Sequence, residues 1–273
     1  MIEVQRYLKD KKNEWNRFIS SSTNSTFLFD RKYMDYHSDR FKDHSLIIYY
    51  KGQILAVLPA NEKDEIIESH GGLTYGGLKY DDRMTTELAL ETFSLIKEYY
   101  LKNKKTTILY KCIPAIYHKR PSDEDLYCLF RNAANLVARN PSSVIDMKYS
   151  KSIPGKKSNG ARKAKRIGLS LTKVKDPQRV LKEVDHNLKI RYKKNAIHSY
   201  SEIKLLCDLF PKNIEVFELT NELKNIIGGA IVYLSDRVAH LQYCVITKSG
   251  RPLRGMDFLI SELFNRYSSL YQY

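Results

Sequence analysis

The sequence predicts an α/β protein made of two tandem domains, each a mixed sheet flanked by helices. The order of expected strands and helices repeats roughly between the two halves of the 273-residue chain. A stretch rich in Pro, Gly and Ser, residues 140–160, separates the halves and is typical of a domain boundary. With 42% apolar residues, the chain can bury a core in each half. We place the boundary near residue 150.

The elements of the first half follow from apolar runs, turn residues and helical periodicity. A hairpin at residues 45–59 is the clearest, because two apolar runs meet at Lys51-Gly52. The segment 65–80 contains two Gly-Gly pairs, which indicate a backbone that turns or is closely approached. The other expected elements are a strand at 2–4, a helix through Trp15 and Phe18, a helix at 85–102, a strand at 106–111 and a helix at 122–138.

The second half is expected to end in two strands, a polar loop and a helix. Residues 226–234 and 238–246 are the strands, 248–254 is the loop, and the helix begins at Gly255. The apolar residues of that helix recur at a period of 3.6, which predicts one buried face. The elements expected before them are a helix starting at 161–166, a strand at 169–174, helices at 177–193 and 200–210, and a strand at 214–219.

The final strand, loop and helix together predict a site for an anionic group. The loop supplies Arg251 and Arg254, and free N–H groups at the start of the helix add to the arginine guanidinium groups. An ordinary connection with two solvated arginines is the alternative. His240 and Gln242 alternate onto one face of the preceding apolar strand, which favours a lined cavity or a hydrogen-bonded pair at a domain seam.

Several segments resemble the Fem-like (FemA/FemB-type) branch of the GNAT acyltransferase superfamily. They are residues 238–243, Gly250-Arg251, residues 255–257, the motif HGGLTYGGL at 70–78 and the motif YKCIPAIYHKRPSDEDLY at 110–127. That branch includes peptidoglycan aminoacyl ligases and acyltransferases of surface-polysaccharide gene clusters. The resemblance implies tandem GNAT-like (acyl-CoA N-acyltransferase) domains, an N-terminal one at 1–150 and a C-terminal acyl-donor domain at 151–273. The second domain looks short at its C-terminus, because the Fem-like pattern continues beyond the last helix.

The resemblance also implies where the substrates of such an enzyme would bind. The diphosphate of acyl-CoA would lie on the loop and helix start. The thioester carbonyl would face backbone N–H groups near Cys244 to Ile246, where the resemblance implies a splayed strand. The residues implied for donor binding are Val245, Ile246, Arg251, Leu253, Arg254, Gly255 and Met256. Tandem GNAT folds place the acceptor in a cleft between domains, and the residues that we assign to catalysis are His240, Gln242, His118, Tyr117 and His70.

The formal charge of +15 is concentrated in one segment. Residues 151–194 hold 15 basic and 3 acidic side chains, whereas residues 1–150 hold 23 and 20, and residues 195–273 hold 8 and 8. A clustered positive field attracts polyanions such as CoA phosphates, a nucleotide-sugar diphosphate, RNA or anionic lipid. A solvated face that only maintains solubility is the alternative.

We therefore expect an acyl-CoA-dependent N-acyltransferase that uses acyl-CoA (acetyl-CoA) as donor and no metal. Its acceptor would be an amine, such as an amino sugar or a cell-envelope polysaccharide precursor. One alternative is a Fem-type ligase that takes its acyl group from aminoacyl-tRNA, and another is a non-catalytic polyanion-binding protein. Residues 175–210 are too few for the long helical arm of such ligases, which favours acyl-CoA.

Targeting and cysteine patterns indicate a cytoplasmic location. The chain shows no charged-then-apolar leader and no run of roughly 18 apolar residues, so we expect no transmembrane segment. Peripheral contact with a membrane surface is compatible with this expectation. The four cysteines are scattered without a CxxC pair, which argues against a metal site or a disulfide framework.

Overall fold

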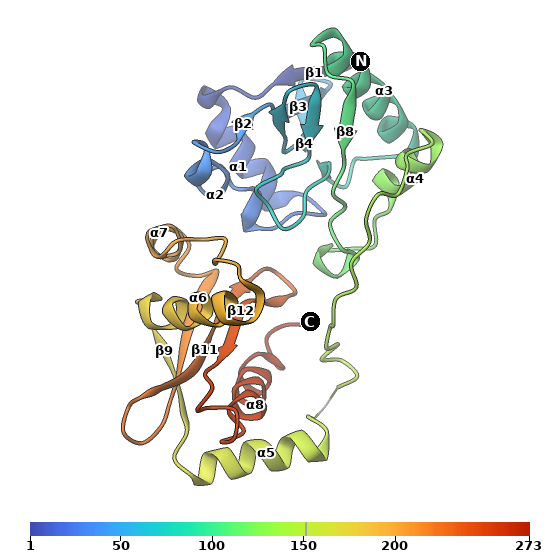
Figure 1. The fold of residues 1–273 in the computed structure, drawn as a ribbon. Coiled ribbons are helices and arrows are strands. Elements are labelled where there is room, and N and C mark those ends of the chain that lie inside the picture. Colours follow the sequence, from blue (N-terminus) through green and yellow to red (C-terminus); the bar gives the residue numbers. More distant parts are fainter. Residues whose placement is uncertain (151) are drawn as a thin grey trace. The chain divides into compact units, whose positions relative to one another are not determined.

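The computed structural model describes residues 1–150 and 152–273, and Figure 1 labels most of its helices and strands. The chain divides into two compact units, Met1–Pro141 and Ser142–Tyr273. Each unit combines β-sheet with flanking helices, which confirms the predicted α/β class. The division lies a few residues before the boundary predicted near residue 150, and residue 151, the first of the predicted second domain, lies outside the described residues.

Two four-stranded sheets form the first unit, in the orders β1-β3-β4-β7 and β2-β5-β6-β8. The predicted hairpin is confirmed as β3 (Leu46–Tyr50) and β4 (Gln53–Leu58). Its turn residues Lys51 and Gly52 both have positive φ, 51° and 76°, as a tight two-residue hairpin turn requires. The other strands are β1 (Ile2–Arg6), β2 (Lys42–Asp43), β5 (Asn61–Lys63), β6 (Ile66–Glu68), β7 (Lys79–Tyr80) and β8 (Thr107–Leu109).

The helices of the first unit are α1 (Lys12–Ser21), α2 (Arg31–Met34), α3 (Thr86–Lys102) and α4 (Glu124–Arg131). The longest, α3, lies where periodicity predicts it. Ala89, Phe93, Ile96 and Tyr100 recur every three or four residues and pack into the core with the strands. Thr85 caps this helix by accepting a hydrogen bond from the N–H of Leu88.

Helix α4 is shorter than predicted. The sequence predicted a helix over residues 122–138, but α4 ends at Arg131. Ala133 adopts a φ of 50°, and Asn132 Nδ2 donates to the carbonyl of Cys128 at 2.7 Å, so local bonds close the helix in a left-handed cap. The apolar side chains of Leu136 and Val137 are consequently exposed rather than part of a helix face.

A buried arginine ties the N-terminal strand to the first helices. Arg31 is 1% exposed, and its guanidinium carbon lies 3.4 Å from the ring centroid of Tyr7 and 4.1 Å from that of Trp15. Asp43 Oδ2 lies 2.6 Å from Arg31 Nη1, whereas Asp35 Oδ1 is 3.8 Å away. The buried cation is therefore balanced by two aromatic rings and one close carboxylate.

One antiparallel sheet in the order β12-β11-β10-β9 forms the second unit. The predicted strands are confirmed as β9 (Ser170–Val174), β10 (Ile214–Thr220), β11 (Ile226–Leu234) and β12 (Ala239–Ile246). The helices are α5 (Gly155–Arg166), α6 (Gln178–Tyr192), α7 (Tyr200–Leu209) and α8 (Gly255–Tyr267). Because α5 begins at Gly155, the last part of the predicted linker is helical.

Helices α6 and α8 cover opposite faces of this sheet. Val180 of α6 lies against Gly229, whereas the neighbouring Ala230 and Val232 share a core with Leu259 of α8. Side chains along a strand alternate between the two faces, so the two helices pack on opposite sides. The buried face of α8 is the one that its apolar periodicity predicted.

Removing the close carboxylate partner of Arg31 is expected to destabilise the protein. Asp43→Asn should lower the free energy of unfolding by roughly 3 kcal/mol, because it leaves a buried cation without its counter-charge. Asp35→Asn, which affects a longer and more exposed pair, should cost under about 1 kcal/mol. Urea unfolding of both variants measures the difference, and equal losses would show that the aromatic rings, not the carboxylate, hold Arg31.

Candidate functional site

The predicted strand, loop and helix are present as β12, residues 247–254 and α8. Arg254 precedes α8 in a left-handed conformation with a φ of 61°. The N–H of Gly255 donates to Gly250 O at 3.0 Å, and that of Arg254 donates to Arg251 O at 3.2 Å. Two of the N–H groups expected to hold a diphosphate are therefore already bonded within the loop.

Two adjoining cavities of about 270 and 840 Å³ lie where α6 faces the end of β12 and this loop. They share the lining residues Asn187, Arg191, Val245, Ile246 and Arg251, and the smaller one is also lined by Cys244, Arg254, Met256 and Asp257. We call these joined cavities the arginine groove. Three guanidinium groups converge on it, which gives it a positive field suited to phosphate oxygens.

Most of the residues that the resemblance implied for donor binding line the arginine groove. Five of the seven line it: Val245, Ile246, Arg251, Arg254 and Met256. The other two, Leu253 and Gly255, stabilise the conformation of the loop. Leu253 packs against the apolar core that contains α8. Gly255 is buried, and a Cβ at this position would lie 3.0 Å from the carbonyl oxygen of Gly250, so its lack of a side chain lets the loop close.

Sequence reasoning missed the contribution of α6 to this groove. Asn187 and Arg191 are four residues apart and therefore share one helix face. Arg251 Nη2 lies 3.5 Å from Asn187 Oδ1, so α6 also positions a loop arginine. The spacing of the two polar residues was readable in the sequence, but the position of their helix beside the loop was not.

Asp257, the acidic residue at the start of α8, is paired with two cations. Asp257 is 8% exposed, and its carboxylate lies 3.2 Å from Lys157 Nζ and 3.8 Å from Arg254 Nη1. A Cβ on Gly160 of α5 would lie 2.3 Å from Asp257 Oδ2, so α5 approaches α8 closely at this point. The carboxylate is thus compensated by two cations, which limits its repulsion of an anion in the groove.

Strand β12 occupies an edge of its sheet and offers backbone donors beside the groove. It pairs with β11, with an irregular register at Gln242, and Thr247 N–H donates to Ile227 O at 2.8 Å. Because N–H groups alternate in direction along a strand, those of Cys244 and Ile246 point away from β11. Within the stretch expected to face the thioester carbonyl, Cys244 and Ile246 therefore present their N–H groups at the edge, whereas Val245 presents its N–H to β11.

Two imidazole-containing pairs involve residues of β12, one within the strand and one with His198, which precedes α7. His240 hydrogen-bonds the Gln242 side chain, and burial lowers the pKa of His240, so the ring is neutral at physiological pH. Tyr243, which the sequence did not single out, places its hydroxyl 2.6 Å from Nδ1 of His198, and burial raises the pKa of this tyrosine. The Tyr243–His198 pair can relay a proton and His240 can accept one, whereas the Gln242 amide only orients the His240 ring; none of these four residues lines the arginine groove.

The three catalytic candidates of the first unit are buried. His70 is 2% exposed, and burial together with the charge of His37 lowers its pKa to about 3, which makes it a weak base. Burial also lowers the pKa of His118. The Tyr117 ring centroid lies 4.6 Å from that of Tyr75, and burial raises the pKa of both hydroxyls. These environments are typical of a packed interior.

Two lysines, which sequence reasoning missed, hold the glycine-rich segment 70–78. Lys79 is fully buried, donates to Gly76 O at 2.6 Å and lies 4.4 Å from the ring centroid of Phe29. Burial lowers its pKa to about 7. Lys111 Nζ donates to the carbonyl groups of His70, Gly71 and Leu73 at 2.9 to 3.2 Å. The segment is therefore organised around two lysine side chains of the first unit.

Within residues 1–150 and 152–273, no cluster of three His, Cys, Asp or Glu side chains is placed to hold a metal ion. No helix in the described part of the chain combines the length and apolar character needed to cross a membrane.

Comparison with solved structures identifies the fold. FemX aligns over 98% of this chain and 86% of its own, with a TM-score of 0.64 at 10% sequence identity. The C-terminal domain of a putative lysylphosphatidylglycerol synthetase from Agrobacterium fabrum aligns over 96% of this chain and 76% of its own, with a TM-score of 0.60 at 11% identity. L-PGS from Bacillus licheniformis gives 0.58 at 10% identity, over 96% and 72% of the two chains.

Neither a protein-family model nor a curated protein sequence matches the chain. The likeness to FemX and to the synthetase domain confirms the Fem-like fold that the sequence motifs implied. At these low identities the likeness concerns the fold, and function has to be argued from the site.

The buried Lys79 is expected to make stability rise with pH. The folded pKa of about 7 lies below the ordinary 10.5, so below pH 7 both states are protonated and the folded state bears the full cost of the buried charge. Between pH 7 and 10.5 the unfolded chain binds more protons, and this cost is progressively lost. Lys79→Met should therefore raise the free energy of unfolding by about 1 kcal/mol or more near pH 6.

The stabilisation by Lys79→Met should shrink as the pH approaches 10, which denaturant unfolding across this range measures. Lys32→Met, at an exposed lysine of the same unit, is the matched control and should leave the pH dependence unchanged. A constant difference between Lys79→Met and the unmodified protein at all pH values would contradict the prediction.

Proposed function

We propose that the protein is an acyl-CoA-dependent N-acyltransferase whose donor binds in the arginine groove. The observation that carries the proposal is the convergence of Arg191, Arg251 and Arg254 next to the open edge of β12. A CoA diphosphate needs charge-assisted donors, and its thioester needs a backbone donor a short distance away. The groove and the strand edge supply the two features side by side.

The diphosphate would be held mainly by side chains. Since Arg254 and Gly255 use their N–H groups within the loop, the guanidinium groups of Arg191, Arg251 and Arg254 would make the main contacts, with the amide of Asn187 beside them. Arginine forks match phosphate oxygens bidentately, so three of them around one cavity favour a diphosphate over a single carboxylate.

The thioester would lie along the free edge of β12. The N–H groups of Cys244 and Ile246 would stabilise the oxyanion that forms when the amine attacks the carbonyl. The amine must first lose a proton, for which His240, kept neutral by burial, and the Tyr243–His198 pair are the candidates. Collapse of the tetrahedral intermediate then forms the amide bond and releases the CoA thiolate, so the protein needs no nucleophile of its own.

The acceptor that we propose is an amine on an amino sugar or on another cell-envelope polysaccharide precursor. The support for this assignment is the sequence resemblance to the Fem-like branch rather than a feature of the groove. His70, Tyr117 and His118, the candidates in the first unit, are buried, so we assign them no contact with the acceptor. A cytoplasmic location would suit both substrates.

An aminoacyl-tRNA donor is the second candidate, and α5 is the observation that favours it. This helix carries Lys156, Lys157, Arg162, Lys163, Lys165 and Arg166, and a surface cavity lies against Arg162, Lys165 and Arg166. Such a basic helix suits an RNA backbone. Against it, α6 and α7 span 15 and 10 residues, so the described residues of this region contain no long helical arm.

Loss of the loop arginines is expected to weaken CoA binding. Arg251→Ala and Arg254→Ala should each cost roughly 1–2 kcal/mol, less than a buried charged bond because both side chains are exposed. Calorimetric titration of CoA into the protein and the double variant measures this. Lys212→Ala, at an exposed lysine of the same unit that lines neither cavity of the arginine groove, is the control and should leave affinity almost unchanged.

Equal CoA affinity in the unmodified protein and the double arginine variant would show that the loop is not the donor site. Gly255 is unsuitable for this test, since a side chain there would disturb the loop through Gly250 whether or not a ligand binds.

Charge reversal on α5 separates the two donors. Lys163→Glu, Lys165→Glu and Arg166→Glu together should reduce tRNA binding strongly at low salt, with a smaller loss as salt rises. If the donor is acyl-CoA bound in the arginine groove, the same variant should bind CoA with nearly unchanged affinity. Binding of charged tRNA but not CoA by the unmodified protein, measured by filter binding and calorimetry, would favour the ligase.

A further inference from the structure

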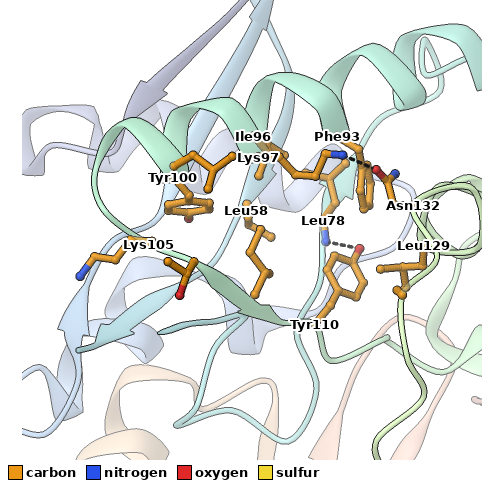
Figure 2. A pocket seen from close by; sticks show the side chains of 14 residues that line it. Leu58, Leu78, Phe93, Ile96, Lys97, Tyr100, Lys105, Tyr110, Leu129 and Asn132 are labelled. Atoms are coloured by element: carbon orange, nitrogen blue, oxygen red, sulfur yellow. Dashed lines mark hydrogen bonds between the residues drawn. The ribbon is translucent and has the colours of Figure 1, made fainter. Parts of the chain in front are cut away.

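The first unit contains an apolar cavity beneath α3 that the proposed reaction does not use (Figure 2). Its volume is about 250 Å³, and all of its lining residues belong to the first unit. The walls are chiefly Leu58, Leu78, Phe93, Ile96, Tyr110 and Leu129. It is larger than an engineered apolar cavity of about 150 Å³ that stays dry and binds benzene.

The polar atoms on its tyrosine walls are bonded outside the cavity. Tyr100 donates its hydroxyl to His44 O at 2.9 Å. The Tyr110 hydroxyl donates to Asp125 Oδ2 at 2.7 Å and accepts from the N–H of Leu78 at 2.6 Å, the latter drawn in Figure 2. Both tyrosines therefore present ring carbon to the cavity, which leaves little to hold water and favours an apolar occupant.

The cavity is elongated along the helix. Its lining residues on α3 run from Phe93 to Leu101, a rise of about 12 Å along the helix axis. On the opposite wall they follow the chain from Thr106 to Tyr110 across β8. A linear hydrocarbon chain fits a cavity of this elongated shape better than a compact ring system does.

One uncompensated cation lies at the mouth. Lys97 is exposed, lines the cavity and donates to the neutral Asn132 Oδ1 at 2.6 Å, and it has no carboxylate partner in the part of the chain that the structure describes. Figure 2 shows this pair on one side of the cavity. Lys105, also a lining residue, lies 2.6 Å from Glu62 Oε2, so its charge is already paired. The mouth therefore carries the charge of Lys97.

We propose that this cavity binds a single linear acyl chain with an anionic end group, for which a fatty-acid anion is the simplest example. The chain lies along α3 against Phe93 and Ile96, and the anionic group pairs with Lys97. Asn132 holds the ammonium at the mouth. A neutral chain would gain the apolar contacts alone, and a cationic amphiphile would be repelled by the same lysine.

The first test uses calorimetric titration of the full chain with decanoate, decanol and decyltrimethylammonium. Decanoate should bind at one site per chain, more tightly than decanol, and decyltrimethylammonium should bind least. Each methylene added between octanoate and decanoate should tighten binding roughly fourfold, as burial of apolar surface predicts. No binding of decanoate, or equal binding of all three amphiphiles, would overturn the proposal.

Variants then locate the site. Lys97→Met should weaken decanoate binding roughly 3- to 10-fold and leave decanol binding unchanged, because only the charged contact is lost. Lys102→Met, at an exposed lysine of the same helix, is the control and should change neither. Ala134→Trp, at an exposed lining residue, should block the cavity and reduce the binding of both ligands, with an unaltered unfolding curve as the check on folding.

If Lys97→Met and Lys102→Met affect decanoate equally, the anion does not meet Lys97. If Ala134→Trp leaves decanoate binding unchanged while the protein stays folded, the ligand binds elsewhere. Either result overturns the assignment.

Discussion

The free edge of β12 is the constraint on which the candidate site depends. β12 pairs with β11 on one side only, apart from its first residue, whose N–H donates to Tyr273 O at 2.8 Å. The N–H groups of Cys244 and Ile246 consequently face outward, where a ligand carbonyl can accept from them. The strand then passes into a loop that Gly250 and Gly255 close tightly. Backbone donors and arginine side chains thus reach the same groove because one edge strand leads directly into one helix.

The cations of the protein divide into buried and exposed ones. Three cations of the first unit are buried or half-buried: Arg31 lies between two aromatic rings, and Lys79 and Lys111 donate into the glycine-rich segment. Such charges are costly to bury, so each has several fixed partners and each specifies one packing arrangement. The second unit keeps Arg251 and Arg254 exposed, where they remain available to an external anion. Burial therefore separates the cations that maintain the structure from those that can bind a ligand.

Sequence reasoning was most accurate where the signal was local. The hairpin at 45–59, the last three strands and α8 follow from alternation and helical periodicity, which depend on neighbours only a few residues apart. It failed at α4, where a side-chain bond from Asn132 and a left-handed residue end a helix that the apolar pattern would have continued. The pattern of apolar and polar residues does not indicate at which residue such a cap ends the helix.

The sequence alone therefore determined the α/β class, the strand-loop-helix with its two arginines, and the concentration of charge in residues 151–194. Only the tertiary structure decided which distant residues join them. Asn187 and Arg191 reach the loop because α6 packs across the sheet, and the cavity beneath α3 is lined by residues that come from α3, β8 and the end of α4. Lys79 looked like any surface lysine in the sequence and is fully buried. Periodicity reports which face of an element is apolar, whereas contacts between elements depend on how those faces pack together.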